Sequence, residues 1–246
     1  MSIIATYNIK GGVGKTATAV NLAFLSAREG ARTLVWDLDP QAAATFYFRV
    51  KPKVKGGSKG LMRRKTDLDR VIRATDFERL DLLPGDFSYR RMDLALDRAK
   101  KPAQRLAKML QPLVEDYDVL FIDCPPNITL VSEAVFVAAD LLLVPTIPTT
   151  LSLRTLDRLR RHLSKKRFCQ VELLPFFCMA DRRKKLHRTT SDELRGGPSG
   201  FLRTAIPYSS LVEQMGVRRA PLATFAGSTP VARAYESLWL EIRERL

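Results

Sequence analysis

The sequence predicts a single α/β domain over residues 1–246, built on a mostly parallel, twisted sheet with helices on both faces. Its 246 residues and its hydrophobic content of 46% suffice for one large core. Short apolar runs alternate with helical patterns, and a glycine-rich turn joins the first run to the first helix. This alternation is typical of parallel sheets, whose ligands bind beyond the carboxyl ends of the strands.

The predicted strands are the short apolar runs at 3–7, 33–36, 80–83, 119–122, 141–144 and 173–177. Between the first two, residues 16–28 place Val20, Phe24 and Ala27 at helical spacing. Gly30 can end this helix, which completes a βαβ unit. A last helix is expected to begin at Pro230 and to pack an apolar face against the core.

The chain is strongly basic, with 41 Lys and Arg against 26 Asp and Glu, and a net charge of +15. A field of this size attracts nucleic acid or an anionic membrane, and charge alone does not choose between them. Basic clusters lie at 49–65, 154–167 and 182–188. The first contains glycines and no acidic residue, which predicts a mobile loop. Few aromatic residues accompany these charges, so contact with duplex phosphates is favoured over base stacking.

The cysteine pattern and the hydropathy pattern bear on the compartment. Cys124, Cys169 and Cys178 are widely spaced and lack metal-ligand spacing, which favours reduced thiols in a cytosol. The sequence shows no signal-peptide pattern and no apolar stretch of membrane-spanning length. We therefore expect a cytoplasmic protein.

A glycine-rich loop stands between the first predicted strand and the first predicted helix. Its residues are Lys10, Gly11, Gly12, Val13, Gly14, Lys15 and Thr16. Backbone N–H groups of such a loop, together with a helix N-terminus, can surround phosphate oxygens. Lys15 can neutralise β and γ phosphates, and the Thr16 hydroxyl can bind Mg²⁺. The common G-x-x-x-x-G-K-[ST] pattern fails, because its first glycine would stand at Ile9.

Acidic residues follow two of the predicted strands. Asp37 and Asp39 come after the strand at 33–36, and Asp123 ends the strand at 119–122. Parallel strands end at the same edge of the sheet, so these acids should lie near the glycine-rich loop. A buried carboxylate is costly unless it meets a cation, and Mg²⁺ at the strand ends would supply one. A helix N-cap or turn role is the alternative for Asp37 and Asp39.

These motifs resemble those of the ParA/MinD superfamily of P-loop ATPases. The loop with its second lysine, Lys10, is similar to the family's deviant Walker A loop. The segment 37–41 resembles its D-x-D-P-Q motif, and 118–126 resembles its Walker B motif, D-C-P-P included. The resemblance covers nearly the whole chain. It implies a slow, Mg²⁺-dependent ATPase that forms a homodimer around two ATP molecules and is stimulated by a small ParB-like or adaptor partner with a basic N-terminus.

The resemblance also assigns roles to residues. Catalysis is expected from Lys10, Lys15 and Asp39, with Asp39 orienting the attacking water and Lys10 reaching the nucleotide of the other subunit. ATP contacts are expected from Lys10, Gly11, Gly12, Val13, Gly14, Lys15, Thr16, Ala17, Met179, Asp181 and Pro207. Magnesium contacts are expected from Thr16, Asp37 and Asp123. The family often has Arg-Asn where this chain has Tyr208-Ser209, so DNA contacts are assigned to Arg182, Arg183, Arg218 and Arg219.

The sequence thus predicts an ATP-dependent dimerisation switch that binds double-stranded DNA non-specifically and positions a plasmid, chromosome or large protein assembly on the nucleoid. A MinD-like membrane-associated ATPase is the alternative, although its amphipathic tail is not found after the last helix. An iron-sulfur reductase would need suitably placed cluster cysteines. A DNA-binding protein with a decayed nucleotide site would not keep Lys15, Thr16, Asp39 and Asp123. No residue identifies the cargo.

Overall fold

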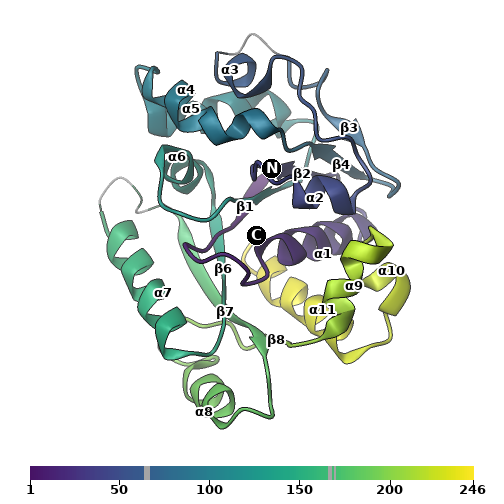
Figure 1. The fold of residues 1–246 in the computed structure, drawn as a ribbon, viewed down its shortest axis with the longest axis vertical. Helices are drawn as coiled ribbons and strands as arrows, with labels where there is room; N and C mark the ends of the chain where they lie inside the picture. Colours follow the sequence, from purple (N-terminus) through teal and green to yellow (C-terminus); the bar gives the residue numbers. More distant parts are fainter. Residues whose placement is uncertain (64–66, 166–167, 169) are drawn as a thin grey trace.

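The computed structural model describes residues 1–63, 67–165, 168 and 170–246. An eight-stranded sheet lies at the centre of the molecule (Figure 1). The strands are β1 (Ser2–Thr6), β2 (Thr33–Asp37), β3 (Arg73–Ala74), β4 (Leu80–Leu83), β5 (Val119–Asp123), β6 (Leu141–Thr146), β7 (Glu172–Ala180) and β8 (Ala205–Pro207). Their spatial order is β3-β4-β2-β5-β1-β6-β7-β8. Within the described sheet, only β3 and β4 pair antiparallel. The predicted α/β class with a mostly parallel sheet is confirmed.

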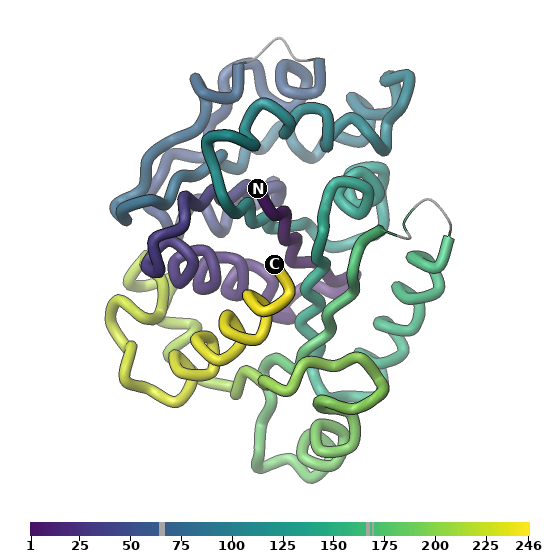
Figure 2. The backbone as a smooth tube through the Cα atoms, turned by 180° about the vertical axis from the view of Figure 1, so that it is seen from behind, coloured from purple at the N-terminus to yellow at the C-terminus, as the bar shows by residue number. Residues whose placement is uncertain are grey.

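Helices cover both faces of this sheet. They are α1 (Lys15–Arg28), α2 (Ala43–Tyr47), α3 (Gly57–Met62), α4 (Met92–Asp97), α5 (Pro102–Leu110), α6 (Leu130–Ala138), α7 (Thr150–Leu163), α8 (Lys185–Leu194), α9 (Ser210–Arg218), α10 (Ala223–Ala226) and α11 (Pro230–Arg243). Successive strand residues point to opposite faces. Val35 and Phe121 therefore pack in one core with α1 and α11, which lie alongside each other in Figure 2. Trp36 and Ile122 pack in the other core with α5, α6 and α7.

The short apolar runs became β1, β2, β4, β5, β6 and β7, as predicted, and both expected helices formed. The helix predicted at 16–28 is α1, and the helix predicted from Pro230 is α11. Strands β3 and β8 were not anticipated, because two or three residues are too few to show a strand pattern. β8 extends the sheet beside β7 and leads into α9, which forms part of the candidate site.

The basic segment 49–65 departs from the predicted loop, because it contains helix α3. Leu61 and Met62 are buried against the core on the α5 and α6 face. The Asp86 carboxylate accepts a hydrogen bond from the Val54 backbone N–H at 2.8 Å, which ties the segment to the chain after β4. Residues 64 and 65 lie outside the described residues. Because the segment is rich in lysine and arginine, the sequence did not indicate that these apolar residues are buried. Mobility of the segment stays a prediction.

The thiols that the structure describes are consistent with reduced cysteines. Cys124 and Cys178 are free and buried, and burial raises the pKa of the Cys178 thiol to about 12. Cys169 lies outside the described residues. Among the described helices, none has both the length and the apolar character that a bilayer span requires.

The sheet register places the predicted acidic residues at one edge. The parallel pairing of β1 with β5 sets Thr6 beside Asp123, and the pairing of β2 with β5 sets Asp37 beside the same residue. β1 then leads through residues 7–14 into α1. The carboxyl ends of β1, β2 and β5 therefore meet next to the N-terminus of α1.

Candidate nucleotide-binding site

A cavity of about 470 Å³ opens at this edge of the sheet. It is lined by the glycine-rich loop and the first turn of α1, by Asp39 after β2, and by Met179 and Pro207 at the ends of β7 and β8. The loop residues that line it are Gly11, Gly12, Gly14, Lys15, Thr16 and Ala17. The structure thus brings together most of the residues predicted to contact ATP, although they come from distant parts of the chain.

Three of the predicted contacts do not line this cavity. Val13 is buried, with 1% of its surface exposed, and belongs to the loop's inner side. Lys10 is exposed at the loop's start, where its backbone N–H donates to Asn8 Oδ1 at 2.9 Å. Asp181 lines a neighbouring cavity and forms an ion pair with Arg183, with Oδ2 and NH2 3.0 Å apart. Asp181 therefore lines a different cavity from Met179, while Pro207 lines both.

The loop's backbone leaves room for an anion. Gly12 and Gly14 have φ angles of 67° and 93°, which glycine adopts without strain. A Cβ added at Gly12 would meet no atom within 4 Å, whereas one at Gly14 would lie 2.8 Å from Cys178 Sγ. Gly14 is the N-cap of α1 but has no side chain to bond the first-turn N–H groups, and that turn contains no acidic residue. These N–H groups, with the helix dipole, suit a phosphate.

The Lys15 side chain lies beside this space. Its side chain is 7% exposed, and its Nζ donates to the Lys10 backbone carbonyl at 3.2 Å. Burial lowers the pKa of Lys15, while the nearby Asp123 carboxylate opposes that shift. A phosphate would supply the negative charge that compensates the buried ammonium group.

Asp37 and Asp123 form a buried acidic pair. Burial is the main cause that raises the pKa of each carboxyl above its usual range, and each acid also has a second carboxylate nearby. Asp37 Oδ2 accepts hydrogen bonds from the Thr45 backbone N–H at 2.8 Å and from Thr45 Oγ1 at 2.7 Å. Asp37 Oδ1 accepts from the Asp39 N–H at 3.2 Å. Asp37 is therefore engaged in holding the start of α2.

Asp123 is less fully bonded. Its Oδ1 accepts a 3.4 Å hydrogen bond from Thr6 Oγ1, and its buried Oδ2 has no hydrogen-bond partner among the described residues. An orphaned carboxylate oxygen close to Thr16 and Lys15 suits a hard cation such as Mg²⁺. The described residues contain no cluster of three or more His, Cys, Asp or Glu that could hold a metal alone. This fits Mg²⁺, which usually takes one or two carboxylates and completes its shell with phosphates and water.

Asp39 lies in the wall of the cavity, and its Oδ1 accepts from the Gln41 backbone N–H at 2.9 Å. The wall of the cavity also contains residues that were not predicted from the sequence. Tyr208 and Glu213 line it, with the Tyr208 hydroxyl donating to Glu213 Oε1 at 3.3 Å. Tyr47 of α2 lines it as well. In the sequence, this part of the wall was indicated only by Tyr208-Ser209, which stands where the family often has Arg-Asn.

The predicted DNA residues occupy two separate places. Arg182 and Arg183 precede α8 at the lower end of Figure 1, whereas Arg218 and Arg219 end α9 on its right-hand side. Arg218 is exposed. Arg219 lies 4.5 Å over the Phe46 ring, and its Nε donates to the Phe46 carbonyl at 3.1 Å. Its guanidinium group is therefore committed to joining α9 to α2.

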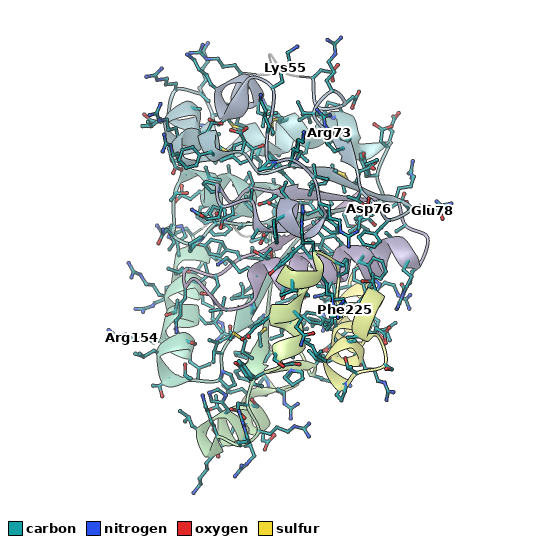
Figure 3. All side chains as sticks on the ribbon, turned by 45° about the vertical axis from the view of Figure 1, so that its right-hand side comes forward. Lys55, Arg73, Asp76, Glu78, Arg154 and Phe225 are labelled. Carbon is teal, nitrogen blue, oxygen red and sulfur yellow. The ribbon has the colours of Figure 1, made fainter. Side chains whose placement is uncertain are left out.

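Most of the basic cluster at 154–167 lies on α7, whose buried face carries Leu156, Leu159 and Leu163. Residues 166 and 167 lie outside the described residues. Figure 3 shows Arg154 projecting from α7 at one side of the molecule, far from Lys55 at its upper end. The basic clusters are therefore distributed over the surface rather than joined in one patch.

Comparison with known proteins identifies the family. A family model described as an AAA domain matches residues 1–169. The chromosome partitioning protein ParA of Myxococcus xanthus is 30% identical over 202 residues, which cover 79% of this chain and 70% of that protein. The chain belongs to the ParA family of ATPases. Its ParA-family relatives also include the sporulation initiation inhibitor protein Soj of Bacillus subtilis, 28% identical over 98% of this chain and 97% of Soj.

The fold agrees with this ParA-family membership. A Cyanothece McdA variant in complex with ATP superposes with a TM-score of 0.86 at 22% identity, over 99% of this chain and 96% of that chain. This likeness confirms the P-loop fold of the ParA/MinD type.

Proposed function

We propose that this ParA-family chain is an ATP-dependent dimerisation switch that binds DNA non-specifically and hydrolyses ATP to partition or position a cargo. The observation that carries the proposal is the cavity that joins the glycine-rich loop and Lys15 to Asp39, beside the buried Asp123. The Myxococcus relative is named a chromosome partitioning protein, which supports the cargo-positioning part.

In this proposal the phosphates of ATP lie against the loop and the first turn of α1. The loop N–H groups and Lys15 bind the phosphate oxygens, and Ala17 forms part of the wall. Thr16 and Asp123 would hold Mg²⁺, while Asp37 supports them by fixing the start of α2. Bound Mg²⁺ would supply positive charge that stabilises the phosphate groups. Met179 and Pro207 flank the base, and Tyr208 offers it an aromatic surface.

Hydrolysis is assigned to Asp39 and Lys10. Asp39 stands in the cavity wall, where its carboxylate can orient a water molecule toward the γ phosphate. Lys10 is exposed and outside the cavity of its own subunit, so its ammonium group is available to the nucleotide of a facing subunit. Such a contact couples dimerisation to the γ phosphate, because hydrolysis removes the charge that attracts Lys10. Turnover is slow and rises when a small partner with a basic N-terminus binds.

DNA binding is assigned to Arg182, Arg183 and Arg218, with Arg219 positioning the end of α9 through Phe46. Each subunit offers two separated basic sites. Dimerisation doubles them on one particle and raises the avidity for duplex phosphates, which makes DNA binding depend on ATP. The proposed place of action is the nucleoid in the cytoplasm, without membrane contact.

The experiment that tests this function is DNA binding measured with and without a non-hydrolysable ATP analogue. Wild type should bind an arbitrary 60-base-pair duplex only with the analogue, and Lys15→Ala should bind it in neither condition. Arg203→Ala, which also removes one positive charge, is the control and should bind DNA as wild type does, since Arg203 lies outside every residue set assigned above. Equal DNA binding with and without nucleotide would contradict the switch.

A further inference from the structure

A second cavity, of about 580 Å³, lies beside the nucleotide cavity, and of its lining only Arg182 and Pro207 have a role in the function proposed above. It is enclosed by α8, by the ends of β7 and β8, and by α11, which lie together in the lower half of Figure 1. Pro207 lines both cavities, so they are neighbours at the end of β8. Small apolar residues form the floor of the second cavity: Ala180, Ala205, Pro230 and Ala234.

Two polar side chains of α8 are buried in the wall of this cavity. His187 and Ser191 are each 6% exposed and stand one helical turn apart. The Ser191 hydroxyl has no hydrogen-bond partner among the described residues. A buried hydroxyl without a partner is costly, and a ligand in the cavity would remove that cost.

His187 is arranged as a hydrogen-bond donor. Its Nδ1 accepts from the Asp181 backbone N–H at 3.1 Å, so the proton of the neutral ring resides on Nε2. Burial lowers the pKa of His187, which keeps the ring neutral at neutral pH. His187 and Ser191 therefore both offer O–H or N–H donors from the same face of α8.

The charged residues of the lining leave an excess of cations. Asp181 pairs with Arg183, and Asp192 pairs with Arg195 at 3.1 Å. Arg182 and Arg188 line the cavity too, and neither has an ion-pair partner among the described residues, although Arg188 NH1 donates to the Arg182 carbonyl at 2.8 Å. The lining thus combines an apolar floor, two buried donors and unpaired guanidinium groups.

We propose that this cavity binds a small molecule that carries a phosphoryl group on an apolar body. Several donors in one cavity suit the multiple oxygens of a phosphoryl group, and arginine is especially suited to it. A DNA backbone phosphate has the same chemistry, but a duplex contacts exposed surfaces, whereas His187 and Ser191 are almost fully buried. The site does not depend on the proposed ATP switch.

The test uses the histidine side chains as local reporters, because the chain contains 2 histidines, His162 and His187. Imidazole resonances of the full-length protein are followed by NMR during titration with inorganic phosphate and with phenyl phosphate, and His187→Gln assigns the signals. The His187 signal should shift to saturation, at lower concentration with phenyl phosphate, while His162 stays unchanged. Ser191→Ala should raise the dissociation constant by roughly tenfold, since one hydrogen bond to a charged group is lost. Thr189→Ala, an exposed position on the same helix, should not change it.

The titration is repeated in Lys15→Ala, where the same His187 shift is expected, so that failure of the nucleotide assignment does not affect this result. Equal shifts of both histidines, or an unchanged dissociation constant in Ser191→Ala, would overturn the site. Displacement of phenyl phosphate by a DNA duplex at His187 would overturn the small-molecule assignment.

Discussion

Replacing Gly14 by alanine should destabilise the nucleotide-free protein, because neither the backbone conformation at Gly14 nor the space around it accommodates a Cβ. Its φ of 93° is left-handed, and for a residue with a Cβ such a backbone costs about 1–2 kcal/mol. The new Cβ would lie 2.8 Å from Cys178 Sγ, a buried atom at the end of β7. Overpacking of this kind costs about 1–3 kcal/mol. The free energy of unfolding should therefore fall by about 2–5 kcal/mol.

Urea denaturation without nucleotide measures this loss, and Gly11→Ala is the matched control. A Cβ at Gly11 would meet no atom within 4 Å, so its unfolding free energy should stay close to that of wild type. Cys178→Ala, alone and combined with Gly14→Ala, completes a double-mutant cycle. The combined variant should recover the overpacking part and keep the backbone part. Equal stability of Gly14→Ala and Gly11→Ala, or no coupling in the cycle, would refute this reasoning.

Two further predictions concern the nucleotide site, and a third concerns DNA binding. Asp39→Ala should bind ATP as wild type does but hydrolyse it at least about 100-fold more slowly, since orienting water acts on the transition state; phosphate release checks this, and normal turnover would exclude Asp39. Asp123→Asn should weaken Mg²⁺-dependent ATP binding in titration calorimetry. Asp123→Asn should also stabilise the nucleotide-free protein by more than about 1 kcal/mol at pH 7. The reason is that the pKa of Asp123 is raised in the folded state, so wild type loses stability as pH rises above the ordinary carboxyl range. If the substitution gave no gain in stability at pH 7, the raised pKa of the buried Asp123 would be contradicted. Arg218→Glu should lower the log-log salt slope of DNA binding by about one unit per subunit, whereas an unchanged slope would remove Arg218 from the interface.

The central strands and the loop were predictable because they rest on strong local patterns. Continuous apolar runs produced the inner strands, and the glycine-rich turn after β1 fixed the start of α1. β8 could not be predicted in the same way, since three residues give no periodicity. Helix α3 was missed because Lys59 and the two glycines outnumber its two apolar residues, Leu61 and Met62.

The side-chain environment of the site was less predictable than its location. Motifs place Asp37 and Asp123 at one edge, yet only the packing shows that Asp37 bonds Thr45 while Asp123 keeps an orphaned oxygen. In the same way, Arg219 looked like a surface cation in the sequence, but it stacks on Phe46, 173 residues away along the chain. Such contacts depend on tertiary arrangement, which a local pattern does not contain.

The central claim is that ATP assembles two subunits through a lysine supplied by each to the other. The most direct measurement is the mass of the purified protein by light scattering with a non-hydrolysable ATP analogue, for wild type and for Lys10→Ala. Wild type should double its mass when the analogue is added. Lys10→Ala should bind the analogue in a parallel titration and yet keep the mass of one subunit. A Lys10→Ala protein that dimerises as wild type does would contradict the account.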